Sequence, residues 1–266
     1  MADEAKSALT IDVQGSVALV TFDRPHRRNA IDIDTIHELG AFLEKADRDA
    51  TIRAIVLAGS ARDYCTGADM TANPDSAGEM TAMDYRYASV DFQRFFGRLW
   101  DTETPLVSAV TGTVAGAGWM LALLADLVVA AEGARWTHVF SRRGMVPHAG
   151  DPYFLPRIIP FHRLNEIAML SEPITSETLH SWGIVNRCVA PDQVVATAMD
   201  LATKLADGPT RALAMTKRLY RRSLDSDMLT AFEEERSAQA LISTTKDRRE
   251  GMASYLEGRP AKFIGN

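Results

Sequence analysis

The segment Ala109-Val-Thr-Gly-Thr-Val-Ala-Gly-Ala-Gly118 decides the fold, because it joins a β-rich run to the apolar stretch Trp119-Met-Leu-Ala-Leu-Leu-Ala125. The run Leu106–Val110 predicts a strand, and the stretch after Gly118 predicts a helix that opens from a turn of small residues. The first N–H groups of a helix have no intrahelical acceptor and lie at the positive end of its dipole. A turn of this kind is suited to stabilise an oxyanion.

A second small-residue turn, Cys65-Thr-Gly-Ala-Asp-Met70, follows another predicted strand, Ile52–Leu57. An N–H from this turn would complete a two-donor oxyanion hole with the first turn. Taken singly, each turn has a simpler interpretation, since glycine and alanine often only permit close packing.

Strand and helix signals alternate from the first third of the chain onward, which predicts an α/β fold. Strands are also predicted at Val17–Phe22 and Val128–Ala131, and Asp34 is expected to cap a helix with Ile36, Leu39 and Leu43 on one face. Residues 71–84 are predicted to form a loop. The last third favours helices and has few strand signals, so we expect a core over residues 1–200 and a helical region over residues 201–266.

Composition excludes several classes of protein. The 266 residues carry a formal charge of −6, which does not favour nucleic-acid binding. Two cysteines indicate a reducing compartment, and the polar N-terminus has no signal-peptide pattern, so a cytoplasmic location is expected. The apolar stretch Trp119–Ala131 is too short for a membrane span and contains Asp126. The six histidines show no metal-site spacing, so no metal is expected.

Four stretches in order resemble the crotonase (enoyl-CoA hydratase/isomerase) family over roughly residues 10–266. The first two are Arg24-Pro-His-Arg-Arg-Asn-Ala-Ile31 and the Cys65–Met70 turn. The others are the Ala109–Gly118 segment ending at Asp126, and Asp247-Arg-Arg-Glu-Gly-Met-Ala-Ser-Tyr-Leu-Glu-Gly-Arg259. The resemblance implies a spiral core of ββα units and a helical C-terminal region that builds homotrimers, often paired as hexamers.

The resemblance also implies an acyl-CoA substrate and no cofactor beyond the coenzyme A that the substrate carries. It assigns the two oxyanion-hole N–H groups to Ala68 and Ala117. Ala117 stands where the family usually has glycine. Contacts to the substrate or to CoA are implied for Arg28, Ala30, Thr66, Gly67, Asp69, Met70, Gly116, Lys262 and Phe263. The last two match a segment that often touches CoA across a subunit boundary.

The chain departs from the family's hydratases at the two glutamates that add water to an enoyl double bond. Alignment places Met120 at the first position and Phe140 at the second. Neither side chain transfers a proton, so the ordinary hydratase mechanism is not expected.

His148 stands where other members of the family, including dienoyl-CoA isomerases and aryl-CoA dehalogenases, have an aspartate. An imidazole suits acid–base chemistry near neutral pH, and Asp151 is placed to orient or tune it. The alternative is a surface histidine followed by an exposed capping aspartate. His138 would reach the same pocket only with a different local register.

Three hypotheses follow. The first is an acyl-CoA enzyme that stabilises an enolate and moves a proton with His148 or Asp151, in isomerisation, hydrolysis, decarboxylation or carbon–carbon cleavage. The second is a non-catalytic acyl-CoA binding protein. The third is an enzyme that cleaves a non-CoA diketone.

Overall fold

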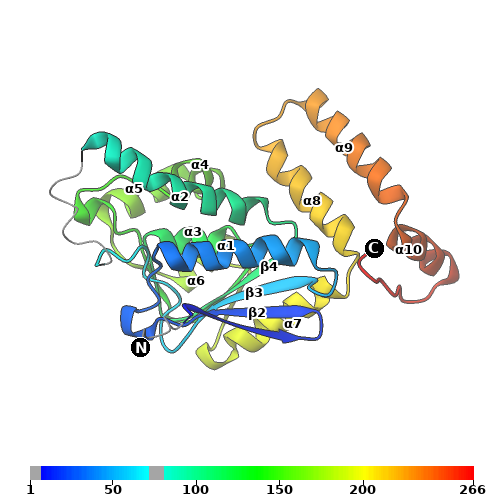
Figure 1. Ribbon diagram of the computed structural model, residues 1–266, viewed down its shortest axis with the longest axis horizontal. Helices are drawn as coiled ribbons and strands as arrows, with labels where there is room; N and C mark the ends of the chain where they lie inside the picture. The colour runs from blue at the N-terminus through cyan, green and yellow to red at the C-terminus, as the bar shows by residue number, and fades with distance from the viewer. Residues whose placement is uncertain (1–6, 72–80) are drawn as a thin grey trace, which may run out of the picture.

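A six-stranded sheet forms the centre of the computed structural model, which describes residues 7–71 and 81–266 (Figure 1). Its strand order is β1-β2-β3-β4-β6-β9, antiparallel between β1 and β2 and parallel elsewhere. A smaller sheet has the order β5-β7-β8. The strands are β1 Leu9–Gln14, β2 Val17–Phe22, β3 Ala54–Gly59, β4 Leu106–Val110, β5 Thr113–Ala115, β6 Leu127–Ala131, β7 Arg135–Thr137, β8 Ile174–Thr175 and β9 Arg187–Val189.

Helices cover both faces of the main sheet and continue beyond it at the C-terminal end (Figure 1). They are α1 Ile33–Arg48, α2 Ala82–Asp101, α3 Ala117–Leu123, α4 Asp151–Ile158, α5 Phe161–Leu170, α6 Ser176–Ser181, α7 Val194–Ala206, α8 Thr210–Ser223, α9 Met228–Ser243 and α10 Lys246–Glu257. The expected α/β core with a helical C-terminal region is therefore confirmed.

The two faces of the sheet pack against different helices because side chains alternate along each strand. In β3, Ile55 and Leu57 join the core that contains α1, α2 and α3. Ala54, Val56 and Ala58 face α7, which meets them with small side chains at Ala198, Ala202 and Ala206. Burial on both faces explains why these strands are continuous apolar runs in the sequence.

Two local expectations need correction. The cap of α1 is Asp32 and not Asp34: the Asp32 backbone is extended, and its carboxylate accepts a 2.9 Å hydrogen bond from the Thr35 N–H. Of the loop expected at 71–84, residues 72–80 lie outside the described residues. Residues 82–84 are helical, because Thr81 and Asp84 form a capping box at the start of α2.

The three C-terminal helices project from the core (Figure 1). Partly buried ion pairs hold α8 against the core. Asp126 binds Lys217 Nζ at 2.7 Å and Arg221 Nη2 at 3.0 Å. Burial lowers the pKa of Lys217 to about 8, although Asp126 opposes the shift. The boundary expected at residue 200 falls inside α7, which packs on the sheet, and the projecting part begins with α8.

Gly118 marks the closest approach of α3 to the Cys65 segment, so we predict that Gly118→Ala destabilises the protein. A Cβ built there would lie 2.3 Å from the Cys65 carbonyl oxygen, and overpacking of this kind typically costs about 1–3 kcal/mol. Gly97→Ala in α2 is the matched control, because its Cβ meets no heavy atom within 4 Å. That variant should gain about 0.5–1 kcal/mol from helix propensity. Denaturant unfolding followed by tryptophan fluorescence tests both, and equal stability of the two variants would contradict the packing.

Candidate active site

The two small-residue turns lie side by side, held in register by a parallel bridge between Cys65 and Val114. Ala68 lies three residues after Cys65, and Ala117 lies three residues after Val114. Between them, Gly67 has φ +96°, and a Cβ there would lie 2.8 Å from the Ala115 carbonyl oxygen and 3.3 Å from the Ala117 amide nitrogen. Glycine is required at position 67 for both reasons. The sequence predicted this meeting of the turns.

The amides of Ala68 and Ala117 are free to serve a ligand. Ile31 accepts from the Asp69 N–H and donates to the Gly67 carbonyl, both at 2.8 Å, so the Ala68 amide between them faces away from Ile31. Ala117 is the first residue of α3 and needs no intrahelical acceptor. Within the described ranges, neither N–H has a hydrogen-bond acceptor. Two backbone donors on adjacent turns, with no acceptor of their own, suit an oxygen that gains negative charge.

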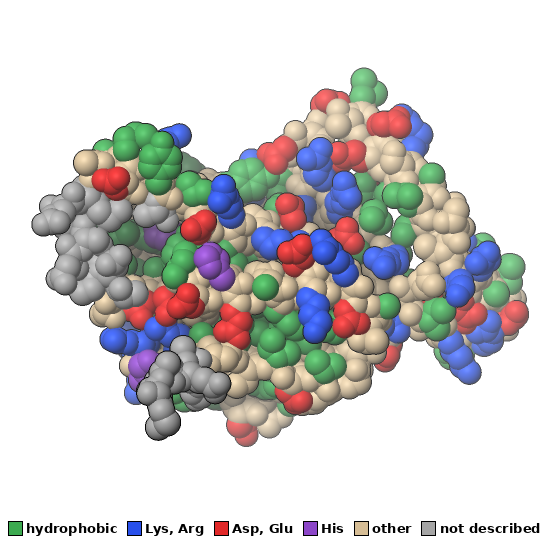
Figure 2. All heavy atoms as spheres, in the orientation of Figure 1, with side chains coloured by type: hydrophobic (Ala, Val, Ile, Leu, Met, Phe, Trp, Pro, Cys, Tyr) green, Lys and Arg blue, Asp and Glu red, His purple; other side chains and the backbone are tan. Residues whose placement is uncertain are grey.

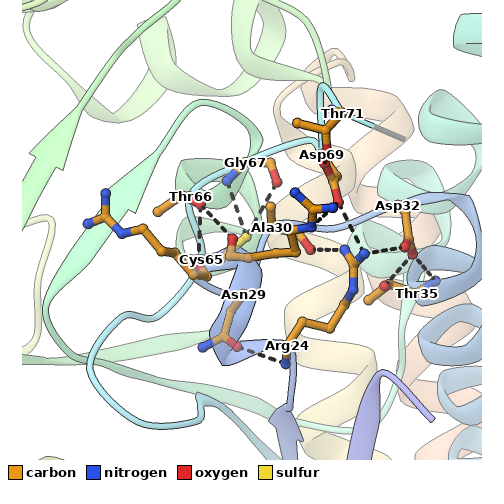
Figure 3. Close-up of polar contacts among 12 residues, drawn as sticks. Arg24, Asn29, Ala30, Asp32, Thr35, Cys65, Thr66, Gly67, Asp69 and Thr71 are labelled. Atoms are coloured by element: carbon orange, nitrogen blue, oxygen red, sulfur yellow. Dashed lines mark hydrogen bonds and ion pairs between the residues drawn. The ribbon is translucent and has the colours of Figure 1, made fainter. Parts of the chain in front are cut away.

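Arg24 holds the 24–30 loop against the second turn (Figure 3). Its Nη2 lies 2.7 Å from Asp32 Oδ2 and 3.1 Å from Asp69 Oδ2, and Nη1 donates to the Ala30 carbonyl. Asp69 also accepts from the Thr71 N–H at 3.0 Å. Ala30 and Asp69, both expected to contact substrate, are thus fixed in the wall of the site by bonds within the protein.

Arg28 is half-exposed and lies beside an open cavity. Its Nε and Nη2 bind the two Asp63 carboxylate oxygens at 2.9 and 3.2 Å. Burial alone would raise the pKa of Asp63, but the hydrogen bonds from Arg28 and Thr113 outweigh it and lower that pKa. A cavity of about 470 Å³ is lined by Pro25, Arg28, Asn29, Ser60, Ala61, Arg62 and Asp63. Two guanidinium groups at its wall suit an anionic group such as a phosphate.

Thr66 and Met70 lie at the rim of the second turn, where the sequence places them. The Thr66 hydroxyl donates to the Arg28 carbonyl at 3.2 Å, and Met70 is exposed. Gly116 precedes Ala117 with φ +52°, and its N–H donates to the Thr137 carbonyl at 3.2 Å. This bond joins the first turn to the end of β7.

Lys262 and Phe263 do not meet these residues within one chain. The Lys262 N–H donates to Glu250 Oε1 at 2.8 Å, and the Phe263 carbonyl accepts from Arg53 Nη1 at 3.3 Å. Arg53 directly precedes β3, whereas the turns follow its other end. The two residues therefore lie at the end of the strands opposite the turns, beside α10.

Apolar side chains occupy both positions at which alignment places the glutamates of a hydratase. Met120 and Phe140 are 1% and 4% exposed. A chain of edge-to-face rings continues from Phe140: His138 and His148 each lie 4.9 Å from it between ring centroids. Trp119 meets His138 at 6.2 Å. The ionisable members of this wall are imidazoles.

Asp151 is buried, so it is not the exposed capping residue of the alternative interpretation, and the hydrogen-bond partner of its carboxylate is not His148. Its Oδ2 lies 2.7 Å from Nε2 of His138, which is fully buried. His148 is half-buried; burial lowers its pKa, and the Asp151 charge acts in the opposite direction. Asp151 thus tunes His148 through its charge while it binds a different histidine.

The sequence prediction gave His138 a smaller role than the structure indicates, although the alternation of side chains around it predicts that it is buried. Trp136, His138 and Phe140 alternate with Thr137 and Val139, and period-two alternation puts the three rings on one side. The apolar partners Trp136 and Phe140 mark that side as the buried one.

Other chemistries find less support in the described part of the chain. No group of three His, Cys, Asp or Glu side chains there is arranged to hold a metal ion. Burial raises the pKa of Cys65 to about 12, so its thiol stays protonated and is not a nucleophile near neutral pH. None of the described helices is long and apolar enough to cross a membrane.

Comparison with known proteins gives the family. The family model described as enoyl-CoA hydratase/isomerase matches residues 12–266. The 1,2-epoxyphenylacetyl-CoA isomerase of Escherichia coli K12 is 32% identical, with 95% of this chain and 97% of that protein covered. The 2,3-dehydroadipyl-CoA hydratase of the same strain is also 32% identical, with 97% and 99% covered. The solved structure of an enoyl-CoA hydratase/isomerase from Cupriavidus metallidurans CH34 is 29% identical and superposes with a TM-score of 0.90, covering 97% of this chain and 96% of that one. The chain belongs to the enoyl-CoA hydratase/isomerase family of the crotonase superfamily.

Proposed function

We propose that the protein is an acyl-CoA isomerase that moves a proton through an enolate, and not a hydratase. One observation carries this proposal: the positions of both hydratase glutamates are filled by the buried, apolar Met120 and Phe140. The imidazole of His148 packs on Phe140 and supplies the proton-transfer group of that wall. A site with an oxyanion hole and one base, but without a pair of carboxylates, suits proton transfer better than water addition.

In the proposed reaction, the thioester carbonyl oxygen accepts hydrogen bonds from the Ala68 and Ala117 N–H groups. His148 removes a proton from the carbon α to that carbonyl, and the electron pair of the broken C–H bond delocalises onto the carbonyl oxygen and the neighbouring C=C bond as a dienolate. The imidazolium then returns the proton to another carbon of the same conjugated system. No water is consumed. Because burial lowers the pKa of His148, its imidazole is neutral and ready to act as a base at pH 7.

The relatives leave both reactions open for a chain of this family. The E. coli protein that is 32% identical over 95% of this chain is named as an isomerase of 1,2-epoxyphenylacetyl-CoA. The other E. coli relative, equally identical, is named as a hydratase of 2,3-dehydroadipyl-CoA. A direct assay for each reaction is therefore needed.

We predict that the protein converts a 3-enoyl-CoA into the conjugated 2-enoyl-CoA and does not hydrate crotonyl-CoA. The first reaction raises the absorbance of the enoyl thioester, and the second would lower it. His148→Gln should slow isomerisation about 10²–10⁴-fold, the usual contribution of a general base, while binding of the CoA ester persists.

The 3-enoyl-CoA and crotonyl-CoA assays, together with CoA-ester binding, separate the hypotheses. Rapid loss of crotonyl-CoA absorbance would show a hydratase and overturn the proposal. Tight binding with no turnover of either thioester would indicate a non-catalytic acyl-CoA binding protein. Indifference to all CoA esters would favour a diketone enzyme. His162→Gln is a matched control that removes a histidine on the exposed side of α5 and should leave the rate unchanged.

Ala117→Pro tests the oxyanion hole by removing one N–H from the backbone. Proline is well tolerated at the first residue of a helix, which Ala117 occupies. We predict that isomerisation falls about 10²–10³-fold, as when other enzymes lose one oxyanion donor. Circular dichroism and the unfolding midpoint should stay close to those of the parent protein. An unchanged rate in a folded variant would exclude the Ala117 N–H from catalysis.

We further propose that Lys262 binds the CoA nucleotide of a neighbouring subunit in a homotrimer or a pair of trimers. In its own chain Lys262 lies beside α10, at the end of the strands opposite the turns. The projecting helices expose large apolar side chains, including Leu229, Phe232 and Leu256, which supports their burial in an assembly.

Lys262→Glu should therefore weaken binding of an acyl-CoA by about 10-fold or more, the order expected for loss of a charged hydrogen bond. Binding of the corresponding acyl-pantetheine should not change, because that thioester carries no nucleotide. Light scattering should give three or six times the chain mass of 29.2 kDa. A monomer, or equal loss for both thioesters, would contradict the assignment.

A further inference from the structure

The segment that carries His148 is a strained turn. The Asp151 N–H donates to the His148 carbonyl at 3.3 Å, which closes a four-residue turn over Ala149 and Gly150. Both central residues have positive φ, +65° and +84°. Glycine adopts this region freely, but alanine does so only against steric resistance from its Cβ. Ala149 is 3% exposed, so the strain lies inside the protein and needs a compensating contact.

The side chain of Asp151 makes such a contact. It is the last residue of the turn and the first of α4, and its carboxylate reaches Nε2 of His138 at 2.7 Å. His138 follows β7, and its carbonyl accepts a hydrogen bond from the Ser171 hydroxyl. His138 is thus held both through its ring and through its backbone carbonyl. The His138 and Asp151 side chains are both almost fully buried.

We propose that the His138–Asp151 hydrogen bond is a clasp that holds the strained 148–151 turn closed and so positions the His148 imidazole on Phe140 at the acyl site. The catalytic use of that imidazole rests on the proposed function, whereas its positioning does not. His138 and Asp151 are positioning residues, since neither is expected to touch the substrate.

The chemistry of the pair supports this role. An ionised carboxylate only accepts hydrogen bonds, so a neutral His138 carries its proton on Nε2. Its other ring nitrogen, Nδ1, is buried and has no partner among the described side chains. The bond to Asp151 is therefore the polar contact that fixes this ring. The same carboxylate favours the protonated form of His148, so one residue affects both the place and the proton affinity of the base.

Three variants separate these effects. Asp151→Asn retains an oxygen that accepts from His138 Nε2–H but removes the charge. Asp151→Ala removes the clasp. Asp151→Ala combined with Ala149→Gly removes the clasp and also the strain, because glycine adopts φ +65° without a Cβ clash.

The readout is the carbon-bound proton of each imidazole, followed by NMR in protein labelled with ¹³C-histidine and assigned with His148→Gln and His138→Gln. We expect the His148 signal of Asp151→Ala to move and broaden, and that of the double variant to return toward the parent. The His148 signal should stay sharp in Asp151→Asn. The titration midpoint of His148 should fall by roughly one pH unit in that variant, because a nearby negative charge is lost. Exchange of α-protons of an acyl-CoA in D₂O should fall about 10-fold or more in Asp151→Ala and recover in the double variant.

An unchanged His148 signal in Asp151→Ala, or no recovery in the double variant, would overturn the clasp. Equal disturbance by Asp151→Asn would show that the charge and not the hydrogen bond is responsible, and would also overturn it. If Asp151→Ala does not fold, the same comparison is made from the other side with His138→Gln, which retains a donor, and His138→Leu, which does not. The NMR readout needs no turnover, so failure of the proposed isomerase activity leaves the outcome of this test intact.

Discussion

The parallel bridge between Cys65 and Val114 is the constraint on which the site depends. It fixes the register of two chain segments that are far apart in sequence, so that Ala68 and Ala117 both arrive three residues later at the same place. Gly67 and Gly118 permit the approach, since a Cβ at either position would meet backbone atoms at 2.8 Å or less. Backbone donors set in this way cannot rotate away, which is the condition for stabilising charge without reorganisation.

Charge near the site is largely neutralised inside the protein. Arg24 is bound by Asp32 and Asp69 (Figure 3). Arg28 is bound by Asp63, so the basic loop that the sequence presents is mainly a structural network. The half-exposed Arg28, beside an open cavity, keeps a face toward solvent. On the face seen in Figure 2, acidic and basic side chains are interspersed and form no broad basic surface, as the net charge of −6 suggests. The anion contacts proposed for this protein are therefore single guanidinium and ammonium groups and not a general positive field.

Apolar and aromatic side chains stand at the two positions where alignment places the glutamates of a hydratase. These are Met120 and Phe140, and the histidines at 138 and 148 flank Phe140. In such surroundings a half-buried imidazole favours its neutral form, which suits a base, whereas a fully buried carboxylate needs a hydrogen-bonded partner. His138 meets that need for Asp151. In the proposed reaction, one imidazole with a buried supporting pair takes the place of two carboxylates.

The sequence by itself determined the fold family, the strands β2 and β4 to the residue, and the meeting of the two small-residue turns. Each of these depends on local patterns: apolar runs, glycine-rich turns and motifs in fixed order. The partner of Asp151 was decided by tertiary structure, because the sequence distance of three favoured His148, whereas the bond goes to His138 on another element. Tertiary structure also decided the location of Lys262 beside α10 and the ion pairs of Arg24 with Asp32 and Asp69. Side-chain pairing between distant segments follows from how elements pack, and one sequence contains no direct record of that packing.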